Sequence, residues 1–207
     1  LQPRLEANFS AQDIPEKALG SGLTDLQAGF GGFEGRALQA GDRLALAGGD
    51  CPPLATPAEF RPTMPHAWCL RTCSASETSL LDANSFSALF ETNWTIAQRA
   101  DRMGLKLAGP SLSVSSDGRM PSAGVMPGTI QCPEDGAPYI LSIDAGTVGG
   151  YPRVAQVARA DRHILGQLKA GDHVRLLHRE HDTAVEELRA KLEYWRPWLP
   201  EIDDVLC

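Results

Sequence analysis

The chain has 207 residues, and its 26 acidic side chains outnumber its 19 basic ones, which gives a formal net charge of −7. Nucleic acids and anionic membranes attract basic surfaces, so neither is expected as a partner. No apolar run is long enough for a transmembrane helix. The 20 glycines and 15 prolines exceed their usual share, which favours β structure with frequent reversals.

The first part of the chain has little periodicity. Residues 1–20 show no clear pattern, whereas residues 21–42 are dense in glycine, which is typical of closely packed backbone. Arg36 is the side chain there best suited to hold an anion or a carbonyl group. Residues 38–44 predict a turn into a strand, and the prolines of residues 48–65 indicate a linker or surface loop.

A second structural unit is predicted after this linker, built from short elements. Asp82 is a plausible N-cap for a helix over residues 82–91. Met103, Leu105 and Leu107 alternate with polar or small neighbours, as in a half-buried strand. Residues 111–121 are rich in serine and predict a loop. The strands expected in this region cover residues 68–72, 94–97 and 101–107.

Residues 128–151 combine a hairpin, a strand and a glycine-rich turn. Residues 133–136, Pro-Glu-Asp-Gly, have the composition of a tight reversal. The apolar run 139–143 predicts a buried strand that ends at Asp144. Gly149 and Gly150 then allow the backbone to approach another group closely. Two interpretations stay open: a polar small-molecule site, or a barrel corner that binds nothing.

The last part of the chain predicts strands over residues 154–158 and 173–177. Asp161 is a plausible cap for a helix between them, which Gly171 would follow. A capping box that begins at Thr183 predicts a C-terminal amphipathic helix. Residues 168–174 also repeat the pattern L-x-A-G-D-x-(L/V) of residues 38–44, which suggests two related barrels.

The cysteines are five in number and form no regular framework, which favours reduced thiols and a cytoplasmic protein. His66, Cys69 and Cys73 have the spacing of part of a zinc site, but a fourth ligand at matching spacing is missing, so no metal is expected. His178 precedes the last helix and is expected to be solvated. The first methionine is Met64, so we expect the chain to begin inside a longer gene product or to lack its head for some other reason.

A set of motifs over about residues 20–180 resembles the biotin-dependent carboxyltransferase family, which includes the C subunit of bacterial 5-oxoprolinase, the allophanate hydrolase subunit 2 domain of urea amidolyase, and KipA. The motifs occur in the family's order. They are Thr24-Asp25-Leu26, Gly31-Gly32-Phe33-Glu34-Gly35-Arg36, Asp101-Arg102-Met103-Gly104, Gly109-Pro110, Ser122-x-Gly124-Val125, Gly128-x-Ile130-Gln131-x-Pro133 and Thr147-x-Gly149-Gly150-Tyr151-Pro152.

This resemblance implies a mainly β fold of two cyclophilin-like barrels, with a few short helices. The expected domains are the remnant of a first barrel (1–47), a proline-rich linker (48–65), a second barrel (66–178), and a C-terminal helix and tail (179–207). The family's N-terminal half is missing here, so a site shared between the two halves would be incomplete.

The resemblance also implies a subunit of an enzyme that acts on amides. The expected reaction is ATP-driven opening of 5-oxoproline to glutamate, with ATP on a partner subunit, or carboxyl transfer from carboxybiotin to a urea-like acceptor. The expected partners are a KipI-like subunit of type B and a small amide substrate, and the chain alone is expected to be inactive. The alternative is a non-catalytic regulatory module, as in KipA.

Both reactions build negative charge on an amide or ureido oxygen, so the pocket needs fixed hydrogen-bond donors. No catalytic residue is identified, and this chain is not expected to bind a cofactor itself. Family members usually carry Arg-Gln where this chain has Ala145-Gly146, a difference that affects substrate identity. The expected substrate-binding residues are Arg102, Gln131, Asp144, Thr147, Gly149, Gly150 and Tyr151.

Overall fold

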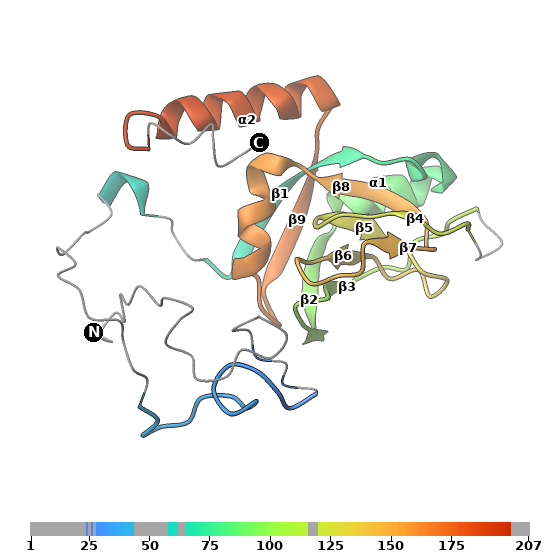
Figure 1. Cartoon of the computed structure of the whole chain (residues 1–207). Helices are drawn as coiled ribbons and strands as arrows, with labels where there is room; N and C mark the ends of the chain where they lie inside the picture. The colour runs from blue at the N-terminus through green and yellow to red at the C-terminus, as the bar shows by residue number, and fades with distance from the viewer. Residues whose placement is uncertain are drawn as a thin grey trace. The chain divides into compact units, whose positions relative to one another are not determined.

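A computed structural model describes residues 24, 26, 28–43, 58–61, 65–115 and 120–199 (Figure 1). The chain divides into two compact units, Leu1–Arg61 and Pro62–Cys207. The described part of the first unit contains a glycine-rich loop and a short 3-10 helix, η1 (Ala58–Phe60). The second unit holds a closed β-barrel.

The barrel has seven strands, and every neighbouring pair is antiparallel except β1 and β9, which close it in parallel. A separate two-stranded sheet joins β4 (Ala123–Gly124) to β7 (Val148–Gly149). The prediction of a mainly β fold is confirmed. The barrel strands, in order around it, are β1 (Ala67–Ser74), β8 (Arg153–Val157), β5 (Thr129–Gln131), β6 (Tyr139–Leu141), β3 (Gly104–Ala108), β2 (Asn93–Ala100) and β9 (His173–His178).

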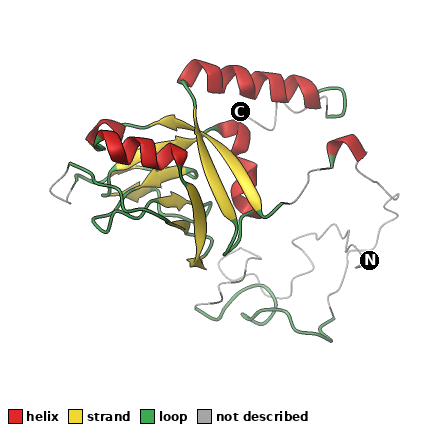
Figure 2. Ribbon diagram, turned by 180° about the vertical axis from the view of Figure 1, so that it is seen from behind, coloured by secondary structure: helices red, strands yellow, loops and turns green. Residues whose placement is uncertain are grey.

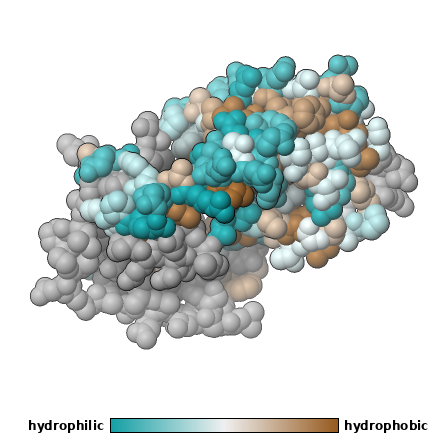
Figure 3. Space-filling view, turned by 90° about the horizontal axis from the view of Figure 1, so that it is seen from above, coloured by the Kyte–Doolittle hydropathy of each residue, from teal (hydrophilic) through white to brown (hydrophobic). Residues whose placement is uncertain are grey.

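The helices of this unit lie outside the barrel (Figure 2). The short 3-10 helix η2 (Thr78–Leu80) leads into α1 (Ala83–Glu91), where Asp82 is the N-cap, as predicted, and accepts a hydrogen bond from the Ser85 amide at 2.7 Å. A second 3-10 segment, η3 (Arg159–Gln167), precedes β9, and α2 (His181–Trp195) follows it. Hydrophilic residues gather over α2 in the view from above (Figure 3).

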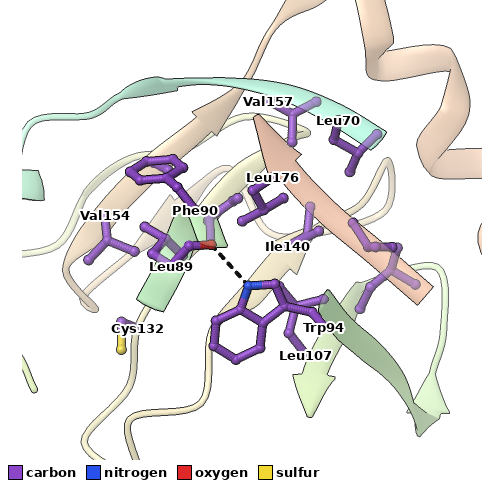
Figure 4. Close-up of a cluster of buried hydrophobic side chains, with 14 of the residues drawn as sticks. Leu70, Leu89, Phe90, Trp94, Leu107, Cys132, Ile140, Val154, Val157 and Leu176 are labelled. Carbon is purple, nitrogen blue, oxygen red and sulfur yellow. Dashed lines mark hydrogen bonds between the residues drawn. The ribbon is translucent and has the colours of Figure 1, made fainter. Parts of the chain in front are cut away.

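The barrel interior is filled by aliphatic side chains from alternate strand positions. Leu70 on β1, Ile130 on β5 and Leu176 on β9 are fully buried. Helix α1 adds Leu89, and the Trp94 indole donates a hydrogen bond from Nε1 to the Leu89 carbonyl oxygen at 3.0 Å (Figure 4). This bond lets the core bury a tryptophan without leaving its donor unpaired.

Two predicted helix starts are wrong. Asp161 is not an N-cap; it lies inside η3 with its side chain buried, and its carboxylate accepts hydrogen bonds from Arg71 on β1. Thr183 does not begin the last helix, because the Glu180 carbonyl already accepts a hydrogen bond from the Ala184 amide at 3.0 Å. Glu180 is therefore the N-cap residue, and no side chain caps this helix.

The repeated L-x-A-G-D turns share one set of hydrogen bonds. In each, the aspartate carboxylate accepts from the amide three residues earlier: Gln39 to Asp42 at 2.7 Å, and Lys169 to Asp172 at 3.2 Å. Each aspartate amide donates back to that residue's carbonyl oxygen. Both glycines have a positive φ, 99° and 87°. The two turns therefore share their local geometry; that residues 1–47 belong to a related barrel stays a prediction, because most of residues 1–47 and 48–65 lies outside the described ranges.

In the glycine-rich loop of the first unit, the Arg36 side chain forms hydrogen bonds with acidic residues of the same unit. Arg36 donates to both carboxylate oxygens of Asp42, at 2.8 and 2.9 Å, and to Glu34 at 3.0 Å. Hydrogen bonds from Arg36 lower the pKa of Asp42 to about 2. The guanidinium also lies 5.0 Å from the centre of the Phe33 ring. Arg36 is thus engaged within its own unit, rather than held free for an external anion as the sequence suggested.

Candidate functional site

The turn between β2 and β3 holds Arg102 at the surface. Asp101 accepts hydrogen bonds from the amides of Met103 and Gly104, at 2.8 and 3.1 Å, in the manner of an Asx-turn. The Asp101 amide donates to the Gly104 carbonyl oxygen at 3.2 Å, which closes the hairpin. The strand therefore begins at Gly104, and Met103 is 55% exposed, not half-buried as its alternation predicted.

The loop after β6 brings Asp144 to this turn. The Asp144 amide donates to the Arg102 carbonyl oxygen at 3.0 Å, and the Ser142 amide donates to that of Met103 at 3.1 Å. Strand β6 ends at Leu141, so the predicted strand was two residues too long, and Ile143 is 74% exposed. Main-chain bonds thus set the separation of two charged side chains.

Arg102 and Asp144 form an ion pair with 2.9 Å between Nε and Oδ2. Their side chains are 67% and 40% exposed, so the pair contributes little to stability. Within the described residues, the Nη nitrogens of Arg102 have no hydrogen-bond partner. The pair therefore presents unused donors beside an acceptor at the surface.

Gln131 is the last residue of β5. It pairs with Tyr139, which begins β6 at the end opposite Asp144. Its side chain is buried, and its amide donates from Nε2 to the Tyr151 carbonyl oxygen at 3.3 Å. A Cβ atom on Gly149 would lie only 2.5 Å from this amide nitrogen, so glycine permits the close approach of β7. Gln131 therefore holds the glycine-rich loop through its hydrogen bond to Tyr151 and its close approach to Gly149.

Arg153 on β8 connects the small β4–β7 sheet to the barrel. It donates to both oxygens of Glu77, each at 2.7 Å, and to the Gly124 carbonyl oxygen of β4 at 3.3 Å. Hydrogen bonds from Arg153 lower the pKa of Glu77 below its ordinary value, although desolvation opposes the shift. The small β4–β7 sheet is therefore connected to the barrel by Arg153 and its ion pair with Glu77. The sequence did not predict this contact.

The predicted site residues fall into two groups, which one loop connects. Arg102 and Asp144 form the first group; Gln131, Gly149 and Tyr151 form the second, and residues 142–152 join them. Thr147 and Gly150 lie on this loop: the Thr147 carbonyl oxygen accepts from the Val125 amide at 3.0 Å, and a Cβ on Gly150 would make only ordinary contacts. That all seven line one concave pocket stays a prediction.

Exposed apolar side chains accompany these polar groups. Tyr151 is 49% exposed, so its ring is not a packing element of the core. Four other apolar residues of these loops are also exposed. The sequence did not predict their exposure, because an apolar residue beside a strand is ordinarily assigned to the core. Besides Tyr151, the exposed apolar residues of these loops are Met103, Met126, Ile143 and Val148.

The described residues were searched for a metal-binding cluster and for a membrane-spanning helix. They contain no cluster of three or more His, Cys, Asp or Glu side chains that could hold a metal ion. His178, which the sequence suggested to be solvated, instead packs against Phe86 and Phe90 of α1. No helix in the described ranges is long and apolar enough to cross a membrane.

Comparisons with known proteins place this geometry in a family. The family model of the carboxyltransferase domain, subdomain A and B, matches residues 13–178. The C subunit of 5-oxoprolinase from Escherichia coli K12 is 32% identical over 185 residues, and that from Haemophilus influenzae is 36% identical over 159 residues. These alignments cover 88% and 77% of this chain but only 58% and 50% of the relatives, so the chain spans about half their length.

A solved structure, the urea carboxylase of Kluyveromyces lactis, aligns with a TM-score of 0.68 at 24% identity, over 84% of this chain and 17% of that one. At this identity the likeness establishes the fold alone. The family model covers most of the chain, and the two 5-oxoprolinase C subunits match it at a higher sequence identity than this solved structure does. The chain belongs to the carboxyltransferase domain family.

Proposed function

We propose that this chain acts as the C subunit of a 5-oxoprolinase-type complex, which opens the cyclic amide 5-oxoproline to glutamate. The observation that carries the proposal is the 32–36% identity to two proteins that are each named as the C subunit of a 5-oxoprolinase. A urea-type carboxyltransferase, with carboxybiotin as co-substrate, is the alternative. Its support from solved structures is a shared fold at 24% identity.

The ion pair at the loop fits the chemistry of a lactam. In a five-membered lactam, the ring holds the N–H and the C=O on one edge. An Arg102 Nη nitrogen would donate to the carbonyl oxygen, while Asp144 would accept from the N–H. Donors fixed before the reaction stabilise negative charge that develops on the amide oxygen. The Gly150 backbone N–H and the Tyr151 hydroxyl would be further donors on the same loop, whereas Gly149 lies in β7 and pairs with Ala123 of β4.

The proposal divides the work between subunits. The described residues contain no phosphate-binding loop of the P-loop type, so ATP would bind to a partner subunit, for which a KipI-like protein is the expected candidate. The isolated chain would then bind its amide substrate weakly and turn nothing over. Thr147 would line the same loop, and Gln131 would hold the loop in place without touching the substrate.

The test is reconstitution of the complex. The chain is co-expressed with its candidate partner subunits, purified as an assembly, and assayed for ATP hydrolysis that depends on 5-oxoproline. Arg102→Gln is expected to lower this activity at least about tenfold, because it removes a charged donor. Lys106→Gln is the matched control, since Lys106 forms a comparably exposed ion pair with Asp135 at 2.7 Å.

Each outcome has a meaning. Activity with 5-oxoproline that falls in Arg102→Gln but not in Lys106→Gln supports both the reaction and the site. Activity with urea and carboxybiotin in place of 5-oxoproline overturns the substrate assignment. An assembly that forms without turnover of either substrate, while the partner's own activity changes, favours the regulatory role instead.

A further inference from the structure

The parallel pair that closes the barrel brings a serine and a histidine together at one barrel end. Thr72 of β1 pairs with His178 of β9, and Ser74 follows two residues later on the same side of β1. The Ser74 hydroxyl lies 3.0 Å from Nε2 of His178. This distance lies within the range in which a histidine can accept the proton of a serine nucleophile.

Helix α1 fixes the histidine ring. The ring centres of Phe90 and Phe86 lie 4.6 and 5.5 Å from that of His178, the latter in an edge-to-face arrangement. Packing on two aromatic rings restricts rotation of the imidazole, so Nε2 stays directed at Ser74. In serine hydrolases an acidic side chain holds the histidine. Here aromatic packing takes that positioning role.

Ser74 also lines a groove of about 720 Å³ between the end of β1, η2 and α1. None of its lining side chains carries a charge, although several carry hydroxyl groups. Such a lining offers hydroxyl groups and apolar surface but no counter-ion, so it suits a small neutral molecule better than a phosphate or a carboxylate. The other lining residues are Ala75, Thr78, Ser79, Leu81, Ala83, Phe86 and Ser87.

We propose that Ser74 and His178 form a nucleophilic pair that accepts a short acyl group from a neutral ester in this groove. The Ser74 Oγ attacks the ester carbonyl carbon while its proton passes to Nε2 of His178. The carbon–oxygen bond to the leaving alkoxide then breaks, and His178 returns the proton to that alkoxide. The products are an acyl ester on Ser74 and a free alcohol.

The start of α1 supplies a candidate donor for the intermediate's oxyanion. Ala83 lies in the first turn of α1, where backbone N–H groups have no partner within the helix. Asp82 engages the Ser85 amide, and the Phe86 amide donates to the Asp82 carbonyl oxygen. Ala83 also lines the groove, so its amide is the donor proposed for negative charge that forms there. This site is independent of the Arg102–Asp144 loop and of the proposed function.

The experiment uses p-nitrophenyl acetate with the full-length chain. Acetylation is followed by intact mass, and the modified residue is located by peptide mapping. Ser79 and Ser87 line the same groove, and within the described residues neither forms a hydrogen bond with a histidine, so they are internal controls. Ser74 is expected to acquire an acetyl group about 100-fold faster than either, which is the contribution typical of a positioned general base. His178→Gln should remove this advantage.

Three results decide the matter. Equal acetylation of Ser74 and Ser87 in the wild type overturns the proposal, as does fast acetylation of Ser74 in a folded His178→Gln protein. Should His178→Gln fail to fold, Ser74→Cys and Ser87→Cys are compared for their rate of alkylation by iodoacetamide. A nearby base makes the cysteine at position 74 react faster; equal rates would again overturn the proposal.

Discussion

Replacing Arg71 by Met would test how α2 and η3 are held to the barrel. Arg71 on β1 donates to Asp161 from its backbone amide at 2.9 Å, from Nε at 2.8 Å and from Nη2 at 2.5 Å. The Asp161 side chain is only 4% exposed. These bonds lower the pKa of Asp161 below its ordinary value, although burial, the largest single effect, acts to raise it.

Arg71→Met leaves this buried carboxylate with one backbone donor. Loss of one partner from a buried ion pair costs about 3–5 kcal/mol, and we expect about 3 kcal/mol because Arg71 itself is 27% exposed. Arg102→Met is the matched control, since it removes an arginine from an exposed pair that contributes about 0–1 kcal/mol. The free energy of unfolding is measured in urea at pH 7 for both variants.

The pH dependence checks the cause. Because the folded-state pKa of Asp161 lies below its unfolded value, the ion pair stabilises the fold above that unfolded value, and the contribution is lost as the pH falls through the folded pKa. The difference between wild type and Arg71→Met should therefore shrink in acid. A loss in Arg71→Met no larger than in Arg102→Met, or one that stays constant down to the pH at which the wild type unfolds in acid, would refute this reasoning.

Three further predictions concern single positions. Gly149→Ala should displace the Gln131 amide and cost about 0.5–1.5 kcal/mol in urea unfolding, whereas Gly150→Ala should stay within about 0.5 kcal/mol; equal losses would contradict the close approach of Gly149 to Gln131. Asp82→Ala should cost about 1 kcal/mol through loss of the N-cap, and an unchanged unfolding midpoint would show that Asp82 does not cap α1. Burial raises the pKa of Cys132 to about 11, so at pH 8 its thiol should react with Ellman's reagent only after denaturation; rapid reaction of the native protein at Cys132, located by peptide mapping, would show that it is accessible.

Local chemistry made much of the barrel predictable. The Pro-Glu-Asp-Gly turn forms as expected, since the Gly136 amide donates to the Pro133 carbonyl oxygen at 3.0 Å and the φ of Gly136 is 70°. β5 and β6 pair across it, with Ile130 opposite Ile140. The Asp82 cap is equally local. Each depends on residues only a few positions apart, which a sequence displays directly.

The failures come from partners distant in the chain. Asp161 has the composition of a helix cap, but Arg71, 90 positions earlier, binds its carboxylate. Ile143 continues an apolar run, yet main-chain bonds to the β2–β3 turn end the strand before it. The proximity of Ser74 to His178 depends on the parallel pairing of β1 with β9, which no local pattern encodes.

That same parallel pairing affects the order in which the barrel can be made. β1 is the first strand of this barrel to leave the ribosome and β9 is the last. The barrel can therefore close only after His173, the partner of Ala67, has been synthesised. Until then, β1 lacks the strand that covers this edge, and an uncovered edge pairs readily with other chains. Closure between strands so far apart in the chain slows folding. The yield of native protein should therefore depend more on the speed of synthesis and the supply of chaperones than on the stability of the folded barrel.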